Sequence, residues 1–137
     1  MGQILGDYEQ RHGGFVFTVP IDIVFSEHNV VQPDLVYFRE ERRHVIDMLA
    51  ATRAAPDLAV EVLSRSTEAR DRGRKMRMLA RFGVSEYWIV DPIKNTLEIY
   101  VLRASEYERV ATHDEHQEVH SPTLPDLSFP AARVFAE

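Results

Sequence analysis

The sequence predicts one domain of the α/β or α+β class, built on a mixed β-sheet. Its centre has the pattern strand, helix, strand: a short apolar run at Leu58–Leu63, a helical segment that ends at Gly83, and a second apolar run at Tyr87–Val90. Such a crossover unit joins parallel strands. Strand-like segments on both sides of it predict a mixed sheet, and 137 residues suit a single domain with one core.

The N-terminal part is expected to begin with a short helix over residues 4–12, which Gly13-Gly14 stops. The segments Phe15–Val19 and Ile21–Phe25 predict a strand pair or one bent strand. The proline between them favours a sheet edge or a bulge, because it lacks the N–H group that a central strand donates.

The next segments lead into the centre of the chain. Leu35–Phe38 predicts a short strand, whereas residues 39–55 are ambiguous, since helix formers and β-branched residues are mixed there. Ser66 or Thr67 can cap the central helix. That helix is expected to run to about residue 82 and to end at a glycine, the usual residue at a left-handed stop.

The C-terminal part predicts further strands and a last helix. Asp91-Pro92 closes the second central strand, and Leu97–Leu102 with Tyr107–Thr112 predicts a hairpin or meander. The final segment, Leu124–Glu137, is expected to end in a short helix from about residue 131.

Composition excludes several classes of site. The chain has no cysteine, so disulfides, thiolate metal sites and a cysteine nucleophile are excluded. Its first residues lack the basic-then-apolar layout of a signal peptide. No apolar run approaches the roughly 18–20 residues of a membrane span. We therefore expect a cytoplasmic protein.

Charge is distributed unevenly along the chain. The formal net charge is −6, which taken alone argues against a nucleic-acid partner. Residues 65–81, however, hold seven basic and two acidic residues, a local charge of +5, so the rest of the chain carries −11. This window can form an anion-binding surface on an acidic protein, although a solvated helix face explains it as well.

Two carboxylates are candidates for a metal site. Glu61 interrupts the apolar run LAVEVL, and a buried carboxylate costs several kcal/mol unless it is paired, protonated or metal-bound. The alternative is an edge strand on which Glu61 faces water. Asp34 opens its own strand, where it could simply cap a turn. If the two strands are neighbours, both carboxylates converge, and Mg²⁺ binds to such carboxylates together with water and substrate phosphate.

The central helix contributes basic candidates. Lys75 shares one helix face with Asp71, Met78 and Phe82, and could extend its amine toward the carboxylates; the alternative is a surface lysine that pairs with Asp71. A second stripe of this helix could contact phosphates. It consists of Arg70, Arg74, Arg77 and Arg81.

Several segments in this order resemble a known family. They are QPDL at 32–35, DLAVEVLSRST at 57–67, RDRGRKMRMLARFGVSEYWIVDP at 70–92 and the ending SPTLPDLSFPAARVF at 121–135. This order resembles the PD-(D/E)XK restriction-endonuclease-like superfamily and, within it, the Uma-two family of bacterial endonucleases. The resemblance covers roughly residues 15–136.

The resemblance implies a restriction-endonuclease-like core, a central mixed sheet flanked by helices. It places Asp34 and Glu61 as the two metal-binding acids, with the main-chain carbonyl of Val62 as a further ligand. The superfamily's lysine usually lies two residues after the second acid, where this chain has Leu63. In this branch the lysine lies on the following helix, a place that Lys75 fits.

The activity implied is endonucleolytic hydrolysis of DNA with Mg²⁺ or Mn²⁺ as cofactor. The cation would lower the pKa of a bound water, and Lys75 would stabilise the growing phosphorane charge. The alternative is a catalytically inactive member that serves as a nucleic-acid-binding or dimerisation module. Hydrolysis of a smaller phosphoester is a remoter reading. Relatives have a longer N-terminal part, so we expect a shortened domain whose uncovered apolar surface forms a homodimer.

Overall fold

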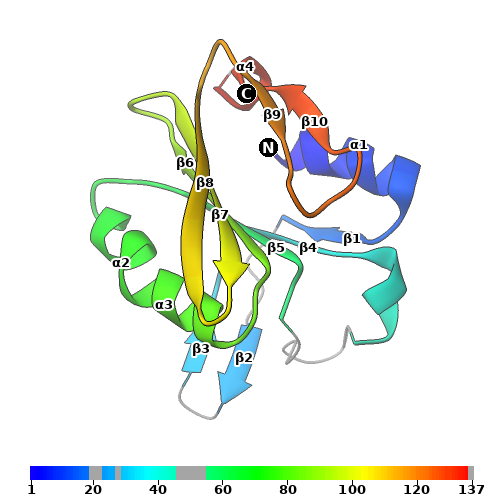
Figure 1. Ribbon diagram of the computed structural model, residues 1–137, viewed down its shortest axis with the longest axis vertical. Coiled ribbons are helices and arrows are strands. Elements are labelled where there is room, and N and C mark those ends of the chain that lie inside the picture. Colours follow the sequence, from blue (N-terminus) through cyan, green and yellow to red (C-terminus); the bar gives the residue numbers. More distant parts are fainter. Residues whose placement is uncertain (19–22, 27–28, 46–54, 136–137) are drawn as a thin grey trace.

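The computed structural model of the protein describes residues 1–18, 23–26, 29–45 and 55–135. A six-stranded sheet forms its centre, in the order β1-β4-β5-β6-β7-β8 (Figure 1). These strands are β1 (Phe15–Phe17), β4 (Leu35–Phe38), β5 (Leu58–Val62), β6 (Glu86–Asp91), β7 (Thr96–Arg103) and β8 (Glu106–Asp114). The β5 and β6 strands are parallel, whereas the other neighbours are antiparallel. The predicted mixed sheet is therefore confirmed.

The remaining elements surround this sheet. The helices are α1 (Gly2–His12), α2 (Glu68–Arg72), α3 (Arg74–Arg81) and α4 (Ala132–Phe135), with a 3-10 segment, η1, at Glu40–Val45. Two small antiparallel sheets pair β2 (Ile23–Ser26) with β3 (Asn29–Val31), and β9 (Glu118–His120) with β10 (Ser128–Pro130). Within the described parts of the chain, no helix is both long and apolar enough to cross a membrane.

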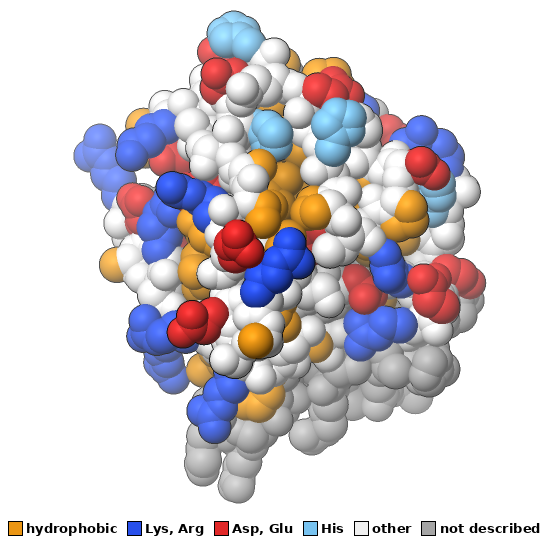
Figure 2. Space-filling view, in the orientation of Figure 1, with side chains coloured by type: hydrophobic (Ala, Val, Ile, Leu, Met, Phe, Trp, Pro, Cys, Tyr) orange, Lys and Arg blue, Asp and Glu red, His pale blue; other side chains and the backbone are white. Residues whose placement is uncertain are grey.

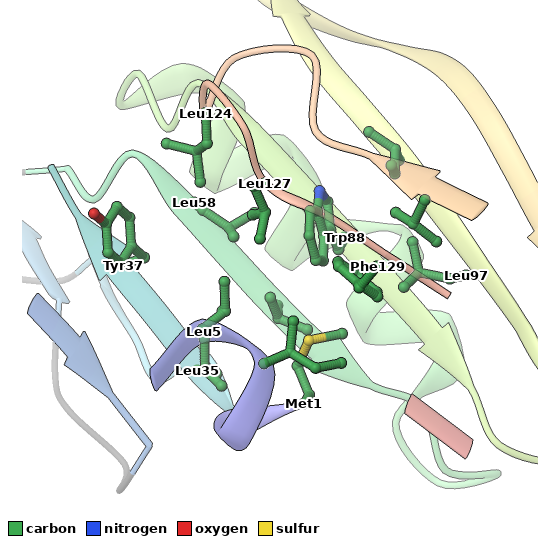
Figure 3. Close-up of a cluster of buried hydrophobic side chains, with 14 of the residues drawn as sticks. Met1, Leu5, Leu35, Tyr37, Leu58, Trp88, Leu97, Leu124, Leu127 and Phe129 are labelled. Atoms are coloured by element: carbon green, nitrogen blue, oxygen red, sulfur yellow. The ribbon is translucent and has the colours of Figure 1, made fainter. Parts of the chain in front are cut away.

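Both faces of the sheet are covered, so the core has two halves. In Figure 1, α1 and the β9-β10 pair lie on one side of the sheet and α2 and α3 lie on the other. The first half packs α1 and the C-terminal segment onto alternate residues of β4 to β7, around Leu5, Leu58, Trp88 and Phe129 (Figure 3). The second half, which includes Leu79, lies beneath α3.

The crossover between β5 and β6 differs from its prediction. One helix was expected up to residue 82, but the structure has two, α2 and α3, which are separated at Gly73. A Cβ atom at this position would lie 2.8 Å from the carbonyl oxygen of Ala69, so the close turn requires glycine. The stop is as predicted: Gly83 has φ +90° and follows the last turn of α3.

The N-terminal strands also pair differently. The sequence predicted that Phe15–Val19 and Ile21–Phe25 form a strand pair or one bent strand. Instead β1 pairs with β4, and β2 pairs with β3. Residues 19–22 lie outside the described residues, as do 46–54 in the stretch that the sequence left ambiguous. The predicted first helix, the hairpin of β7 and β8, and the short helix near the C-terminus are confirmed.

A buried carboxylate ties the C-terminal segment to the sheet. Glu86, at the start of β6, is fully buried and accepts hydrogen bonds from the indole N–H of Trp88 and from the hydroxyl groups of Ser121 and Thr123. These neutral donors reach both carboxylate oxygens, so the buried group is hydrogen-bonded. The segment before β10 is thereby held over the first half of the core.

Candidate active site

The strand register brings the two candidate acids to the same place. In the antiparallel pair of β4 and β5, Leu35 lies opposite Val60, so one further step along each strand sets Asp34 opposite Glu61. A side-chain oxygen of Asp34 accepts a hydrogen bond of 2.8 Å from the backbone N–H of Val62. This bond closes the ladder beyond its last strand pair and fixes Asp34, which is exposed, beside the end of β5.

Glu61 lies inside the protein, not at a sheet edge. Strand β5 is flanked by β4 and β6, and Glu61 is only 2% exposed. The alternative of an edge strand that faces water is therefore wrong. Glu61 has the same strand parity as Ala59 and Leu63, which belong to the half of the core under α3, so its side chain points to the face that α2 and α3 cover.

Lys75 reaches this face from the start of α3. Its Nζ atom lies 3.0 Å from Oε2 of Glu61 and 3.6 Å from Oδ1 of Asp71, and it donates a hydrogen bond of 3.2 Å to the backbone carbonyl of Gln32. The lysine side chain is 11% exposed. The alternative of a surface lysine paired only with Asp71 is therefore wrong, because Lys75 is largely buried between two carboxylates.

Two oxygen atoms of this cluster accept no hydrogen bond from the residues that the structure describes. They are Oε1 of Glu61 and Oδ1 of Asp71, and both are buried. A buried unpaired carboxylate oxygen is costly, since it has lost its water without gaining another donor. Asp71 is 1% exposed, so its oxygen has no access to bulk solvent. The cluster therefore contains two carboxylates whose capacity to accept hydrogen bonds is not fully used by the described residues.

The electrostatics of Glu61 reflect the same imbalance. Burial raises the pKa of the Glu61 carboxyl to about 8, and the ammonium group of Lys75 opposes that rise without cancelling it. Asp34 and Asp71 add to the rise through charge repulsion. One ammonium group is thus too little positive charge for this set of carboxylates. A strongly perturbed carboxylate of this kind marks a candidate functional site.

A hard divalent cation fits the donor set at this site. The unpaired oxygen of Glu61 and the carboxylate of Asp34 are oxygen donors of the type that Mg²⁺ prefers. Across residues 1–18, 23–26, 29–45 and 55–135, no group of three or more His, Asp or Glu side chains is arranged to hold a metal ion. Mg²⁺ needs no such cage, since water and substrate phosphate supply its other ligands. Val62, whose carbonyl the resemblance predicts as a further ligand, is the last residue of β5.

The arginine stripe faces solvent. Arg70, Arg74, Arg77 and Arg81 are all exposed, and Figure 2 shows basic side chains along the flank where Figure 1 has α2 and α3. Arg72 differs from these four, because its guanidinium group is bound to Glu98 and to Glu68.

Sequence reasoning missed the burial of Asp71. Its spacing of four residues from Lys75 indicated contact, but a solvent-facing pair on a helix surface has the same spacing. Asp91, which the sequence placed before Pro92 at the end of its strand, is the last residue of β6. Its Oδ1 accepts hydrogen bonds from the backbone N–H groups of Ile93 and Lys94, so it stabilises the turn after β6.

Comparison with known proteins adds a family to this geometry. The chain matches the model of the Uma2 family, whose description is "Putative restriction endonuclease", over residues 1–132. It is also similar to a crystal structure from Anabaena variabilis of "a putative nuclease belonging to DUF820". The TM-score is 0.75 at 18% sequence identity, and the match covers 98% of this chain and 75% of that one, a likeness of fold. No curated protein matches the chain.

Proposed function

The chain belongs to the Uma2 family of restriction-endonuclease-like proteins, and from that premise we propose that it is a nuclease that hydrolyses phosphodiester bonds in DNA with a divalent cation. The observation that carries this proposal is the meeting of Glu61 and Lys75, 3.0 Å apart, in a buried cluster with unpaired carboxylate oxygens. Burial of an acid and an amine removes both charges from water and so opposes folding, whereas such groups are common in catalytic sites.

Asp34 and Glu61 would hold the cation, together with the main-chain carbonyl of Val62. When bound, Mg²⁺ or Mn²⁺ would polarise the substrate phosphate and lower the pKa of a bound water. The hydrogen bond between Asp34 and the Val62 N–H supports this role, because it holds one carboxylate against the strand end that carries the other.

Lys75 would act on the attacking water and on the charge that develops during the reaction. Its ammonium group is within ion-pair distance of Glu61 and is shielded from bulk solvent. In a site of low polarity, an ammonium group stabilises the growing negative charge on the phosphate more strongly than it would in water. The role is electrostatic, so a residue that lacks the charge should not replace it.

The exposed arginine stripe would hold the DNA backbone. Arg74, Arg77 and Arg81 lie on α3, the helix that carries Lys75, and Arg70 lies on α2 just before the break at Gly73, so phosphates bound there would be neighbours of the reacting one. Contacts to phosphate position the nucleic acid without reading its sequence. This part of the proposal makes binding dependent on salt.

The test is nicking of supercoiled plasmid DNA in the presence of Mg²⁺ or Mn²⁺, with EDTA as the metal-free condition. We expect the unmodified protein to nick, and Glu61→Gln and Lys75→Met each to lose at least about a hundredfold in rate, as removal of an electrostatic catalytic group does. Lys94→Met is the matched control, since Lys94 is the other lysine of the chain and is exposed in the turn after β6. Equal rates for Lys75→Met and Lys94→Met would refute the role of Lys75.

A second candidate function is nucleic-acid binding without cleavage. The exposed arginines favour it, because they need no catalytic centre. DNA binding that falls with salt, together with a complete absence of nicking in either metal, would support this candidate over the nuclease.

A further inference from the structure

Asp71 is a buried charge that the proposed function does not use. Its side chain is 1% exposed, and its Oδ1 has no hydrogen-bond partner in the part of the chain that the structure describes. The nearest cation is Lys75, whose Nζ lies 3.6 Å from that oxygen, beyond hydrogen-bond distance. A buried carboxylate with one oxygen that accepts no hydrogen bond from the described residues needs an explanation, because a neutral side chain would cost less to bury.

The fold holds Asp71 firmly in this place. The hydroxyl group of Tyr87, on β6, donates a hydrogen bond of 3.0 Å to the backbone carbonyl of Asp71. The next residue, Arg72, is bound to Glu98 on β7. Gly73 then separates α2 from α3, so Asp71 and Lys75 lie on opposite sides of the break. The backbone of Asp71 is thus tied to the sheet, while the lysine comes from the following helix.

Lys75 has two carboxylates within reach and a single positive charge to share between them. In this structure it is close to Glu61, at 3.0 Å, and more distant from Asp71. A divalent cation on Glu61 would repel the ammonium group and share its carboxylate. The lysine would then lose its close carboxylate and keep the carbonyl of Gln32 and the longer contact with Asp71, which is unfavourable for a buried charge. Its flexible four-carbon chain allows a short movement to another acceptor.

We propose that Asp71 is a positioning residue that receives the ammonium group of Lys75 when a divalent cation occupies the carboxylate of Glu61. The inference rests on the proposed function, because it takes a cation at Glu61 as given. Without Asp71, the displaced ammonium group has no buried carboxylate to move to, so it competes with the cation for Glu61. Asp71 therefore favours metal binding and keeps Lys75 ordered beside the reacting phosphate.

The chain itself offers a direct probe of this exchange. It has two lysines, Lys75 and Lys94, so a sample labelled with ¹⁵N-lysine gives two Nζ signals in NMR, and exposed Lys94 is the internal reference. On titration with MgCl₂, we expect the Lys75 signal of the unmodified protein to shift and to stay protected from exchange with water. In Asp71→Asn, we expect the MgCl₂ concentration at the midpoint of the titration to rise about tenfold, the size of effect usual between charged groups in contact. We also expect the Lys75 signal to lose its protection from exchange with water.

Glu68→Gln is the matched control, since Glu68 is a carboxylate of the same helix that binds to Arg72 and not to Lys75. It should titrate like the unmodified protein. A Lys75 signal that responds to Mg²⁺ identically in Asp71→Asn and in the unmodified protein would overturn the inference while leaving the proposed function intact. A Lys75 signal that ignores Mg²⁺ in the unmodified protein would overturn both.

A double-mutant cycle separates positioning from direct metal binding. Calorimetric titration with Mn²⁺ should show that Asp71→Asn weakens binding about tenfold when Lys75 is present and hardly at all in a Lys75→Met background. An equal loss in both backgrounds would mean that Asp71 acts as a ligand or as a distant charge, and the inference would fail. If Lys75→Met does not fold, the NMR comparison decides the question, because it keeps Lys75 in every variant.

Discussion

The backbone N–H of Val62 donates a hydrogen bond of 2.8 Å to the carboxylate of Asp34, and this bond links the residue before β4 to the last residue of β5. Asp34 therefore has two separable functions, since the hydrogen bond needs an acceptor and the cation needs a charge. Asn keeps an acceptor oxygen at this position, whereas Ala keeps neither.

We expect Asp34→Asn to change the free energy of unfolding little and to abolish metal binding. Asp34→Ala should lose metal binding and also about 1 kcal/mol of stability, the usual net value of one hydrogen bond. Urea unfolding and calorimetric titration with Mn²⁺ measure the two effects. Retained metal binding in Asp34→Asn would mean that Asp34 is not a ligand.

Divalent cations should stabilise the folded protein. A ligand that binds only the native state adds about 2.7 kcal/mol at one hundred times its Kd. We therefore expect Mg²⁺ or Mn²⁺ to raise the Tm, EDTA to reverse the change, and Glu61→Gln to abolish it. A Tm that rises equally in Glu61→Gln would place the cation elsewhere.

Glu98 should make the protein less stable in acid. Burial alone would raise its pKa, but hydrogen bonds from Arg72 and Tyr100 outweigh burial and hold the pKa below the ordinary value of 4.5. Between these two pKa values the unfolded chain binds more protons than the folded chain. The stabilisation by Glu98 is therefore complete above the pKa of the unfolded state and is lost as the pH falls through the pKa of the folded state.

Urea unfolding at several pH values, for the unmodified protein and Glu98→Gln, measures this contribution. We expect Glu98→Gln to lose stability less steeply than the unmodified protein below about pH 4.5, because Glu98 of the unfolded chain binds its proton there and glutamine does not titrate. Parallel curves would show that Arg72 and Tyr100 do not stabilise the charged form.

Two glycines should respond to the same substitution with opposite signs. Gly14 has φ +87°, and a Cβ there would lie 2.4 Å from the carbonyl oxygen of Phe38 and 2.4 Å from the hydroxyl oxygen of Tyr37. We expect Gly14→Ala to destabilise by at least about 2 kcal/mol through strain and overlap. Gly6 lies inside α1 with open space at its Cβ position, so Gly6→Ala should stabilise by about 0.4–1 kcal/mol. Thermal melts of both variants check the pair.

The arginine stripe should control how DNA binding depends on salt. Each lost phosphate contact lowers the slope of log Kd against log salt by about 1. We expect Arg77→Ala to lower the slope and to weaken binding for all DNA sequences alike, as measured by fluorescence anisotropy. Arg103→Ala is the control, because exposed Arg103 lies on β7 and pairs with Glu108. A slope equally reduced in both variants would exclude a specific stripe.

Much of the fold followed from local patterns. The apolar runs that became β5 and β6 were recognisable because strands buried on both faces have continuous apolar sequences. Gly83 predicted its helix end because the left-handed conformation is local to one residue. Glu61 stood out for the same reason, as a single charge within such a run, although its role in metal binding stays a prediction.

Tertiary structure decided what depends on distant partners. The pairing of β1 with β4 was not predictable, because it depends on contacts between the backbones of separate segments rather than on the character of one segment. The same holds for Asp71. On the sequence alone its carboxylate fits a solvated helix face. Only the packing of α2 and α3 against the sheet buries it beside Lys75, where low polarity makes its charge matter.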